Sequence, residues 1–101
     1  MFFKNNFDFV AIGDTTIDAF IRIKEASVNC DINKENCQIC FDFANKIPYE
    51  SVTIVPAVGN SANAAVTAAR LGLKSAFVGN IGADQNGKDC INALKANNVY
   101  T

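Results

Sequence analysis

The 101-residue sequence contains no histidine and no tryptophan, and it has only two prolines. Without histidine, the chain cannot supply a Ser-His-Asp or Cys-His catalytic group, or an imidazole ligand for zinc. Nine basic residues nearly balance ten acidic ones, so no strong field would attract nucleic acid or an anionic membrane surface. This length allows one small domain, or one part of a larger domain.

Long hydrophobic runs are also missing. Asn and Asp interrupt the apolar residues of positions 1–8 before a signal-peptide core can form. The longest stretch of low charge, residues 47–69, contains two prolines, a glutamate and a glycine, and cannot span a membrane. We therefore expect a soluble, cytoplasmic protein with no membrane or nucleic-acid partner. In that compartment its four cysteines should be free thiols.

The two ends of the sequence carry the pattern of an α/β fold. Two short apolar runs, residues 9–12 and 75–79, predict buried parallel strands, the first of them buried on both faces. The Ala-rich segment 60–71 predicts a helix with a small-residue face that can pack closely on a sheet. Asp84 is a candidate N-cap for a second helix over residues 85–97. This order indicates parallel strands with crossover helices.

The middle of the sequence has a different character. Alternating apolar residues predict a strand with one protected face over 17–23, and the polar stretch 25–36 predicts a loop. Residues 38–44 and 49–55 favour β-structure and flank a Pro-containing turn. They are expected to form a hairpin or a small flap.

Polar residues follow the first predicted strand in the segment Gly13-Asp14-Thr15-Thr16-Ile17-Asp18. Ligands of open α/β sheets bind beyond the carboxyl ends of the parallel strands, so Asp14, Thr16 and Asp18 are candidate binding residues. A carboxylate there can accept hydrogen bonds from two hydroxyls of a polyol. The alternative is that both acidic residues are ordinary turn and edge-strand residues.

A second polar segment, Val58-Gly59-Asn60-Ser61-Ala62-Asn63, opens the Ala-rich helix. Glycine lets the backbone approach a ligand, and the two asparagines lie three apart on one helix face, where amides can bind sugar hydroxyls. The alternative is a helix capped by Asn60, with Asn63 buried and satisfied. The sequence contains neither a Walker loop nor a complete dinucleotide fingerprint.

The cysteines suggest a function of another class. Cys37-Gln38-Ile39-Cys40 has the spacing of a zinc half-site, and Cys30 could add a third thiolate. Without histidine, the fourth ligand would be the distant Cys90, a carboxylate or water. A small Cys-based metal-binding or interaction module is therefore the alternative to a ligand-binding α/β domain.

Three segments, in this order, resemble the ribokinase-like, phosphofructokinase-B type carbohydrate kinases. Residues 10–18 resemble the family's first strand and its sugar-contacting Asp. Residues 58–72 resemble its Gly-Gly-x-x-Ala-Asn-x-Ala segment and the helix that ends in Ala-Arg-Leu-Gly. Residues 77–87 are similar to its Gly-x-x-Gly-x-Asp-x-x-Gly stretch.

The resemblance implies the N-terminal part of a ribokinase-like, parallel-sheet α/β domain. Its core would comprise residues 8–16 and 58–97, and a small β-lid would comprise about residues 17–57. The implied activity is ATP-dependent transfer of phosphate to a hydroxymethyl group of a sugar or nucleoside, with ATP and Mg²⁺ as cofactors of the complete enzyme. The lid would cover the acceptor, and a homodimer formed through the lid is a further expectation.

The resemblance also implies that Thr16 and Asp18 contact sugar hydroxyls, and that the same pocket is lined by Gly59, Asn60 and Asn63. The sequence departs from the family pattern at Val58, which stands where the family has the first of two glycines. A β-branched residue is stiffer than glycine and does not readily adopt positive φ, so hinge motion of the lid at this point is in question.

The family's catalytic base, the Asp of a C-terminal Gly-Ala-Gly-Asp signature, has no counterpart in residues 1–101. The family's nucleotide pocket lies in the same missing region. We therefore expect a kinase fragment that has no catalytic residue, binds no cofactor on its own and is inactive by itself. The residues present do not discriminate among hexose, pentose and nucleoside acceptors.

Overall fold

The computed structural model describes residues 6–101. The chain divides into two compact units: the first comprises the residues up to Asp18 together with Ile54–Thr101, and the second is Ala19–Thr53. Neither helix of the described chain has the length and apolar character that crossing a membrane requires. The expectation that no signal peptide is present falls largely on residues 1–5, which lie outside the described residues.

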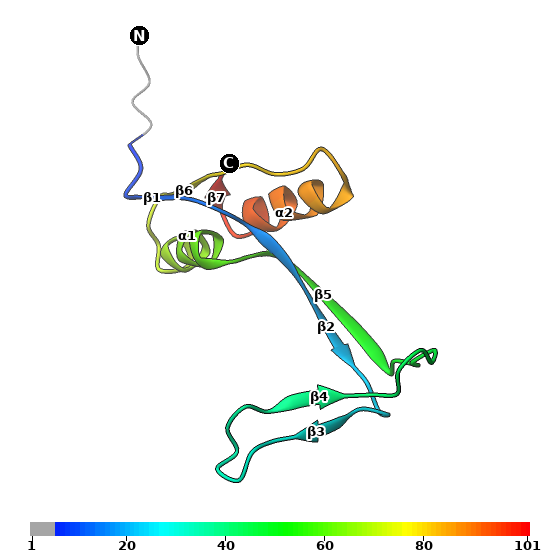
Figure 1. The fold of residues 1–101 in the computed structure, drawn as a ribbon. Coiled ribbons are helices and arrows are strands. Elements are labelled where there is room, and N and C mark those ends of the chain that lie inside the picture. The colour runs from blue at the N-terminus through cyan, green and yellow to red at the C-terminus, as the bar shows by residue number, and fades with distance from the viewer. Residues whose placement is uncertain (1–5) are drawn as a thin grey trace. The chain divides into compact units, whose positions relative to one another are not determined.

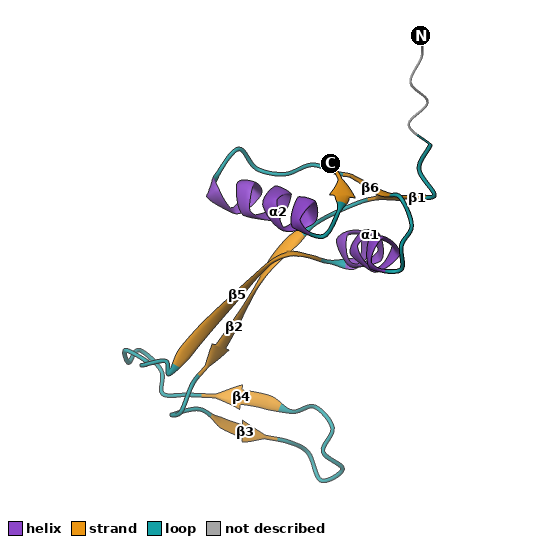
Figure 2. Ribbon diagram, turned by 180° about the vertical axis from the view of Figure 1, so that it is seen from behind, coloured by secondary structure: helices purple, strands orange, loops and turns teal. Residues whose placement is uncertain are grey.

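The first unit contains a three-stranded parallel sheet in the order β1-β6-β7 (Figure 1). Strand β1 is Phe9–Ile12, β6 is Ser75–Val78 and β7 is Val99–Tyr100. Helix α1 (Asn60–Arg70) precedes β6, and α2 (Gln85–Ala96) connects β6 to β7, as Figure 2 shows from behind. Parallel strands joined through helices confirm the predicted α/β fold class.

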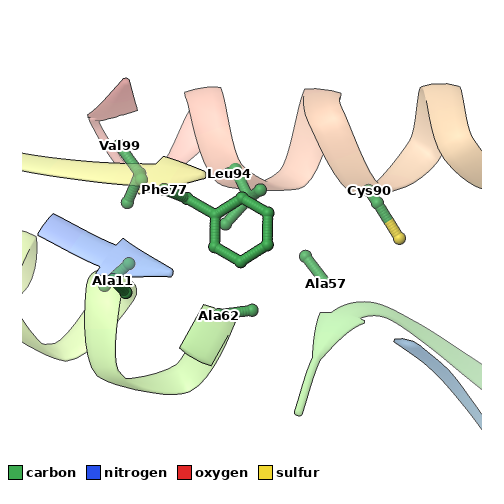
Figure 3. Close-up of a cluster of buried hydrophobic side chains, with 8 residues drawn as sticks. Ala11, Ala57, Ala62, Phe77, Cys90, Leu94 and Val99 are labelled. Atoms are coloured by element: carbon green, nitrogen blue, oxygen red, sulfur yellow. The ribbon is translucent and has the colours of Figure 1, made fainter. Parts of the chain in front are cut away.

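Both helices pack on the same face of this sheet. Ala11 pairs in register with Phe77, and their side chains lie in the core with Val99 and with residues of both helices (Figure 3). On the opposite face the small Ala76 is buried between its strand neighbours, but the four larger side chains are 45–77% exposed: Val10, Ile12, Val78 and Tyr100. The expectation that strand 9–12 is buried on both faces is therefore wrong. Both crossovers advance in the same direction across the sheet, and right-handed crossovers of that kind place their helices on one side.

Small side chains let α1 lie close to the sheet. Ala62 and Ala65 are fully buried, and the buried Ser75 hydroxyl of β6 donates to the Ala65 carbonyl at 2.8 Å. Helix α2 contributes the larger Leu94, which is 1% exposed, and Cys90. The predicted small-residue face of the first helix is confirmed.

Helix α2 begins at the predicted N-cap. The Asp84 carboxylate accepts a hydrogen bond from the Gly87 N–H at 2.8 Å, which satisfies one of the free donors of the first turn. After α2, Asn98 adopts a positive φ of 60° and the chain enters β7. No sequence pattern indicated β7, because a two-residue strand is too short to show a period.

The β-segments of the middle region pair differently from the prediction. Strand β2 (Thr16–Arg22) pairs with β5 (Ser51–Val58), and β3 (Ser27–Asn29) pairs antiparallel with β4 (Gln38–Cys40). The bounds of the strand predicted at 17–23 are thus confirmed to within one residue at each end. Its protected face is not confirmed, because Ala19 is exposed and Ile21 is 54% exposed. The prediction that residues 38–44 and 49–55 form a hairpin with each other is wrong, because each segment pairs with an earlier strand.

The β3–β4 hairpin of the second unit closes on a disulfide. In its register Asn29 lies opposite Gln38, so Cys30 and Cys37 form the next facing pair, and they are bonded to each other. The expectation of free thiols is therefore wrong for these two cysteines. Because the sequence predicted a loop where β3 lies, it could not show that they face each other. Cys40 and Cys90 are free.

Candidate functional site

The candidate residues Thr16 and Asp18 lie where the chain leaves the parallel sheet. The Gly13 N–H donates to the Val78 carbonyl at 3.0 Å, which holds the carboxyl ends of β1 and β6 together. The chain then enters β2, in which Thr16 and Asp18 alternate with Ile17 and share one face. Ile17 packs against the core, whereas Thr16 and Asp18 are exposed.

Gly59 brings the start of α1 next to the start of β2. It is the N-cap residue of α1, with φ 103° and ψ 160°, a conformation essentially limited to glycine. A Cβ atom on Gly59 would lie 3.6 Å from Thr16 Oγ1 and 3.4 Å from the Asp14 carbonyl oxygen. Gly59 and Thr16 are therefore neighbours, as the predicted site requires.

Two hydroxyls fasten this junction. Thr15 Oγ1 donates to the Val58 carbonyl at 3.2 Å, and Ser61 Oγ donates to the Ile12 carbonyl at 3.3 Å. The first bond links the residue before β2 to the last residue of β5, and the second links α1 to the end of β1. Thr16 is thus held beside the start of α1, and Asp18 lies two residues further along β2 on the same strand face.

The backbone around Val58 bends at its two neighbours. Ala57 has a φ of 58° and Gly59 a φ of 103°. The Ala57 side chain is buried in the core, so packing offsets the cost of the left-handed conformation, about 1–2 kcal/mol. The two residues with positive φ therefore lie on either side of Val58, which stands where the kinases that the sequence resembles have the first of two glycines.

The two candidate asparagines lie in the first turn of α1, and both are exposed. The alternative in which Asn60 caps the helix and Asn63 is buried is therefore wrong. Gly59 is the N-cap and makes no side-chain capping bond, and the Asn63 N–H donates to the Gly59 carbonyl at 2.8 Å. Both amide side chains are placed where a ligand can reach them.

Two separate hollows lie beside the candidate residues. Thr16 lines one of about 370 Å³, and Asn63 lines another of about 320 Å³ between α1, β5 and the end of α2. Asn80 and Asn86 share the first hollow with Thr16. The sequence reasoning missed these two, although Asn80 follows the carboxyl end of β6, where the same strand-end rule applies.

The Gly82-x-Asp84-x-x-Gly87 stretch has a structural explanation. Asp84 caps α2 through the Gly87 N–H, and a Cβ atom on Gly87 would collide with the Gly82 carbonyl oxygen. Glycine at position 87 therefore allows the connection between β6 and α2 to close tightly.

The structure does not support the Cys-based metal site. Cys30 and Cys37 are joined to each other, and Cys40 accepts a hydrogen bond from Asn29 Nδ2 at 3.3 Å. Within residues 6–101, no group of three or more His, Cys, Asp or Glu side chains is placed to hold a metal ion. The proposed set of Cys30, Cys37 and Cys40 is therefore contradicted.

The fold is that of an α/β domain with polar residues after its parallel strands, and comparison with known proteins identifies its family. The family model described as pfkB family carbohydrate kinase matches residues 10–101, and the chain belongs to this family. A similar protein is 5-dehydro-2-deoxygluconokinase of Geobacillus thermodenitrificans (strain NG80-2), which is 41% identical over 69 residues. That match covers 63% of this chain and 20% of the relative, so the chain spans about a fifth of the relative's length. No solved structure matches the chain.

Proposed function

We propose that this chain is the acceptor-binding part of an ATP-dependent carbohydrate kinase, which phosphorylates a hydroxymethyl group of a sugar or nucleoside. The observation that carries the proposal is the meeting of Gly59 with Thr16 at the end of the parallel sheet. Membership of the pfkB family supports a carbohydrate acceptor. A cytoplasmic location is part of the proposal, because ATP is a cytoplasmic phosphate donor; the Cys30–Cys37 disulfide is the one feature of the described chain that is uncommon in that compartment.

The proposed roles follow from the chemistry of each group. The Asp18 carboxylate accepts hydrogen bonds from acceptor hydroxyls, and the Thr16 hydroxyl can donate or accept. The amides of Asn60 and Asn63 bind further hydroxyls from the start of α1. Gly59 leaves space for the acceptor to approach the backbone.

We assign no residue of this chain to ATP, to Mg²⁺ or to removal of the hydroxyl proton. The sequence contains no Gly-Ala-Gly-Asp motif, and residues 6–101 hold no cluster of potential metal ligands. The 101-residue chain alone is therefore expected to show no acceptor-dependent ATP consumption. Such turnover by the pure chain, abolished by Asp18→Ala, would overturn this assignment.

The proposal is tested by Asp18→Ala in the complete kinase that carries this segment. Loss of a charged hydrogen-bond acceptor should cost about 1.5–3 kcal/mol, or about ten- to a hundredfold in acceptor affinity. Asp8→Ala, which removes an exposed carboxylate just before β1, at the opposite end of that strand from the candidate site, is the matched control. The measurement is ATP consumption against acceptor concentration, with D-ribose, D-fructose, adenosine and 5-dehydro-2-deoxygluconate as test compounds. An unchanged acceptor affinity in folded Asp18→Ala would refute the site.

The second unit offers apolar surface for a homodimer. Phe20, Ile21 and Val52 are 61%, 54% and 40% exposed on β2 and β5. Exposed apolar residues on strands of 7 and 8 residues favour pairing with another copy. We therefore propose a lid-mediated dimer, to be tested by light scattering of the complete kinase and of its Phe20→Glu variant. A monomeric wild type, or a variant that stays dimeric, would count against it.

A further inference from the structure

The hollow beside Thr16 extends from the start of β2 to the start of α2. Its volume is about 370 Å³, within the range of about 300–1,000 Å³ typical of small-molecule sites. Thr15, Thr16, Asn80 and Asn86 give it a polar lining. The buried Cys90 also lines it, with its sulfur 4.0 Å from the Thr16 carbonyl oxygen. Polar groups over an apolar base suit a sugar, which presents both hydroxyls and C–H groups.

The polar side chains in and beside the hollow differ in whether they already form hydrogen bonds within the protein. Asp84 Oδ1 accepts from the Gly87 N–H at 2.8 Å, so this carboxylate is used in capping α2. The neighbouring Gln85 donates from Nε2 to Asp89 Oδ1, also at 2.8 Å. For Asn80 and Asn86, the part of the chain that the structure describes supplies no such partner. Their amides are the groups that a ligand would meet.

We infer that this hollow is the subsite for an uncharged, hydroxyl-bearing end of the acceptor, and that Asn80 and Asn86 determine how well this end is bound. The inference rests on the proposed function, because Thr16 belongs both to the proposed acceptor site and to the hollow. An acceptor held at Thr16 and Asp18 extends into the hollow beyond Thr16. The amides of Asn80 and Asn86 then both donate to and accept from its hydroxyls.

The charges around the hollow disfavour a carboxylate or phosphate group. None of the described residues that line it is a lysine or arginine. The N-terminus of α2 carries a partial positive charge of about half a unit, but the Asp84 carboxylate places a full negative charge at the same point. An anion in the hollow would lose hydration without gaining a cationic partner. If the acceptor is a sugar acid, its carboxylate therefore binds elsewhere.

The test compares Asn86→Ala and Asn86→Asp in the complete kinase, with Asn92→Ala and Asn92→Asp as matched controls. Asn92 is exposed on the same helix and does not line the hollow. An aspartate at position 86 lies in the first turn of α2, where the helix dipole favours it, so folding should be retained. The acceptor is whichever of D-ribose, D-fructose, adenosine and 5-dehydro-2-deoxygluconate gives the highest turnover, and circular dichroism checks each variant.

We expect Asn86→Ala to raise the acceptor KM about three- to tenfold, with kcat and the KM for ATP within about twofold of wild type. Asn86→Asp should raise it no more than Asn86→Ala does, because a carboxylate still accepts hydrogen bonds from hydroxyls. Equal acceptor KM values for Asn86→Ala and Asn92→Ala would overturn the subsite. If the acceptor KM of Asn86→Asp is instead more than ten times that of Asn86→Ala, the group bound in the hollow is an anion, and the inference of an uncharged group is wrong.

Asp18→Ala, assayed in parallel, separates the two proposals. If it weakens acceptor binding and Asn86→Ala does not, the proposed function stands and the subsite fails. If Asp18→Ala has no effect on acceptor binding, the proposed function fails, and the subsite inferred from it fails as well.

Discussion

The two units of the chain differ in how they bury their side chains. Every buried residue of the described chain lies in the first unit, where two helices cover one face of the parallel sheet. None of the residues in Ala19–Thr53 is buried. The first unit is therefore stabilised by apolar packing, and the second by strand pairing and local cross-links.

The cross-links of the second unit are a disulfide and a few polar contacts. Besides the Cys30–Cys37 bond, Asn36 Nδ2 donates to Asp31 Oδ2 at 2.8 Å inside the same loop. The Lys24–Glu50 ion pair at 3.5 Å is largely exposed and contributes little. The comparison predicts that core substitutions act on the first unit and that reduction of the disulfide acts on the second.

The largest expected effect is that of Leu94→Ala. This side chain is 1% exposed, and its truncation leaves a cavity in the core, which should lower the free energy of unfolding by about 2–5 kcal/mol. Ile32→Ala is the control, because Ile32 is fully exposed in the second unit and its loss should change stability by less than about 0.5 kcal/mol. Urea unfolding of the complete kinase measures both values. Equal losses would mean that the two units do not differ as described.

A smaller effect is expected when the disulfide is removed. Cys30→Ser combined with Cys37→Ser releases a short loop, and the chain-entropy relation gives a loss of about 2–3 kcal/mol, confined to the second unit. Hydrogen exchange should accelerate in the β3–β4 hairpin and stay unchanged in α1 and α2. Cys40→Ser is the control for loss of a thiol. Equal acceleration in the helices would show that the units unfold together.

The next effect concerns the junction of β5 with α1. Gly59→Ala forces a side chain into a glycine conformation, with a cost of about 1–3 kcal/mol. Gly72→Ala is a matched control: Gly72 also has a positive φ, 90°, but no heavy atom lies within 4 Å of its would-be Cβ. Both variants should lose stability, and only Gly59→Ala should also lose acceptor affinity. Similar acceptor KM values in the two variants would show that Gly59 takes no part in acceptor binding.

The sequence predicted the first unit well because its signals are local. Asp84 caps a helix three residues before Gly87, and the Ala-rich run shows its packing face within α1. The exposure of one sheet face was not predictable in the same way. A short apolar run shows that a strand is apolar, but it does not show how many of its faces other elements cover.

Strand pairing in the second unit was not predictable for a related reason. Alternation and β-propensity indicate a strand, but its partner depends on tertiary contacts. Residues 38–44 and 49–55 were therefore predicted to pair with each other, which is wrong. For the same reason, the sequence did not indicate that Cys30 and Cys37 lie opposite each other. Among the candidate site residues, Thr16 and Gly59 were predicted from strand-end chemistry and family resemblance, and the structure brings these two together. Asn86 was missed because the approach of α2 to β2 exists only in the folded chain.

The most direct test of the central claim is hydrogen exchange of the complete kinase, with and without saturating acceptor and without ATP. If the acceptor binds where β2 meets α1, amides of residues 13–18 and 59–63 should exchange at least about tenfold more slowly when it is bound. Residues 66–72, at the far end of α1, serve as the internal reference and should change little. If exchange is unchanged in residues 13–18 and in residues 59–63, while other parts of the kinase become protected, the assignment of the acceptor site to this chain is contradicted.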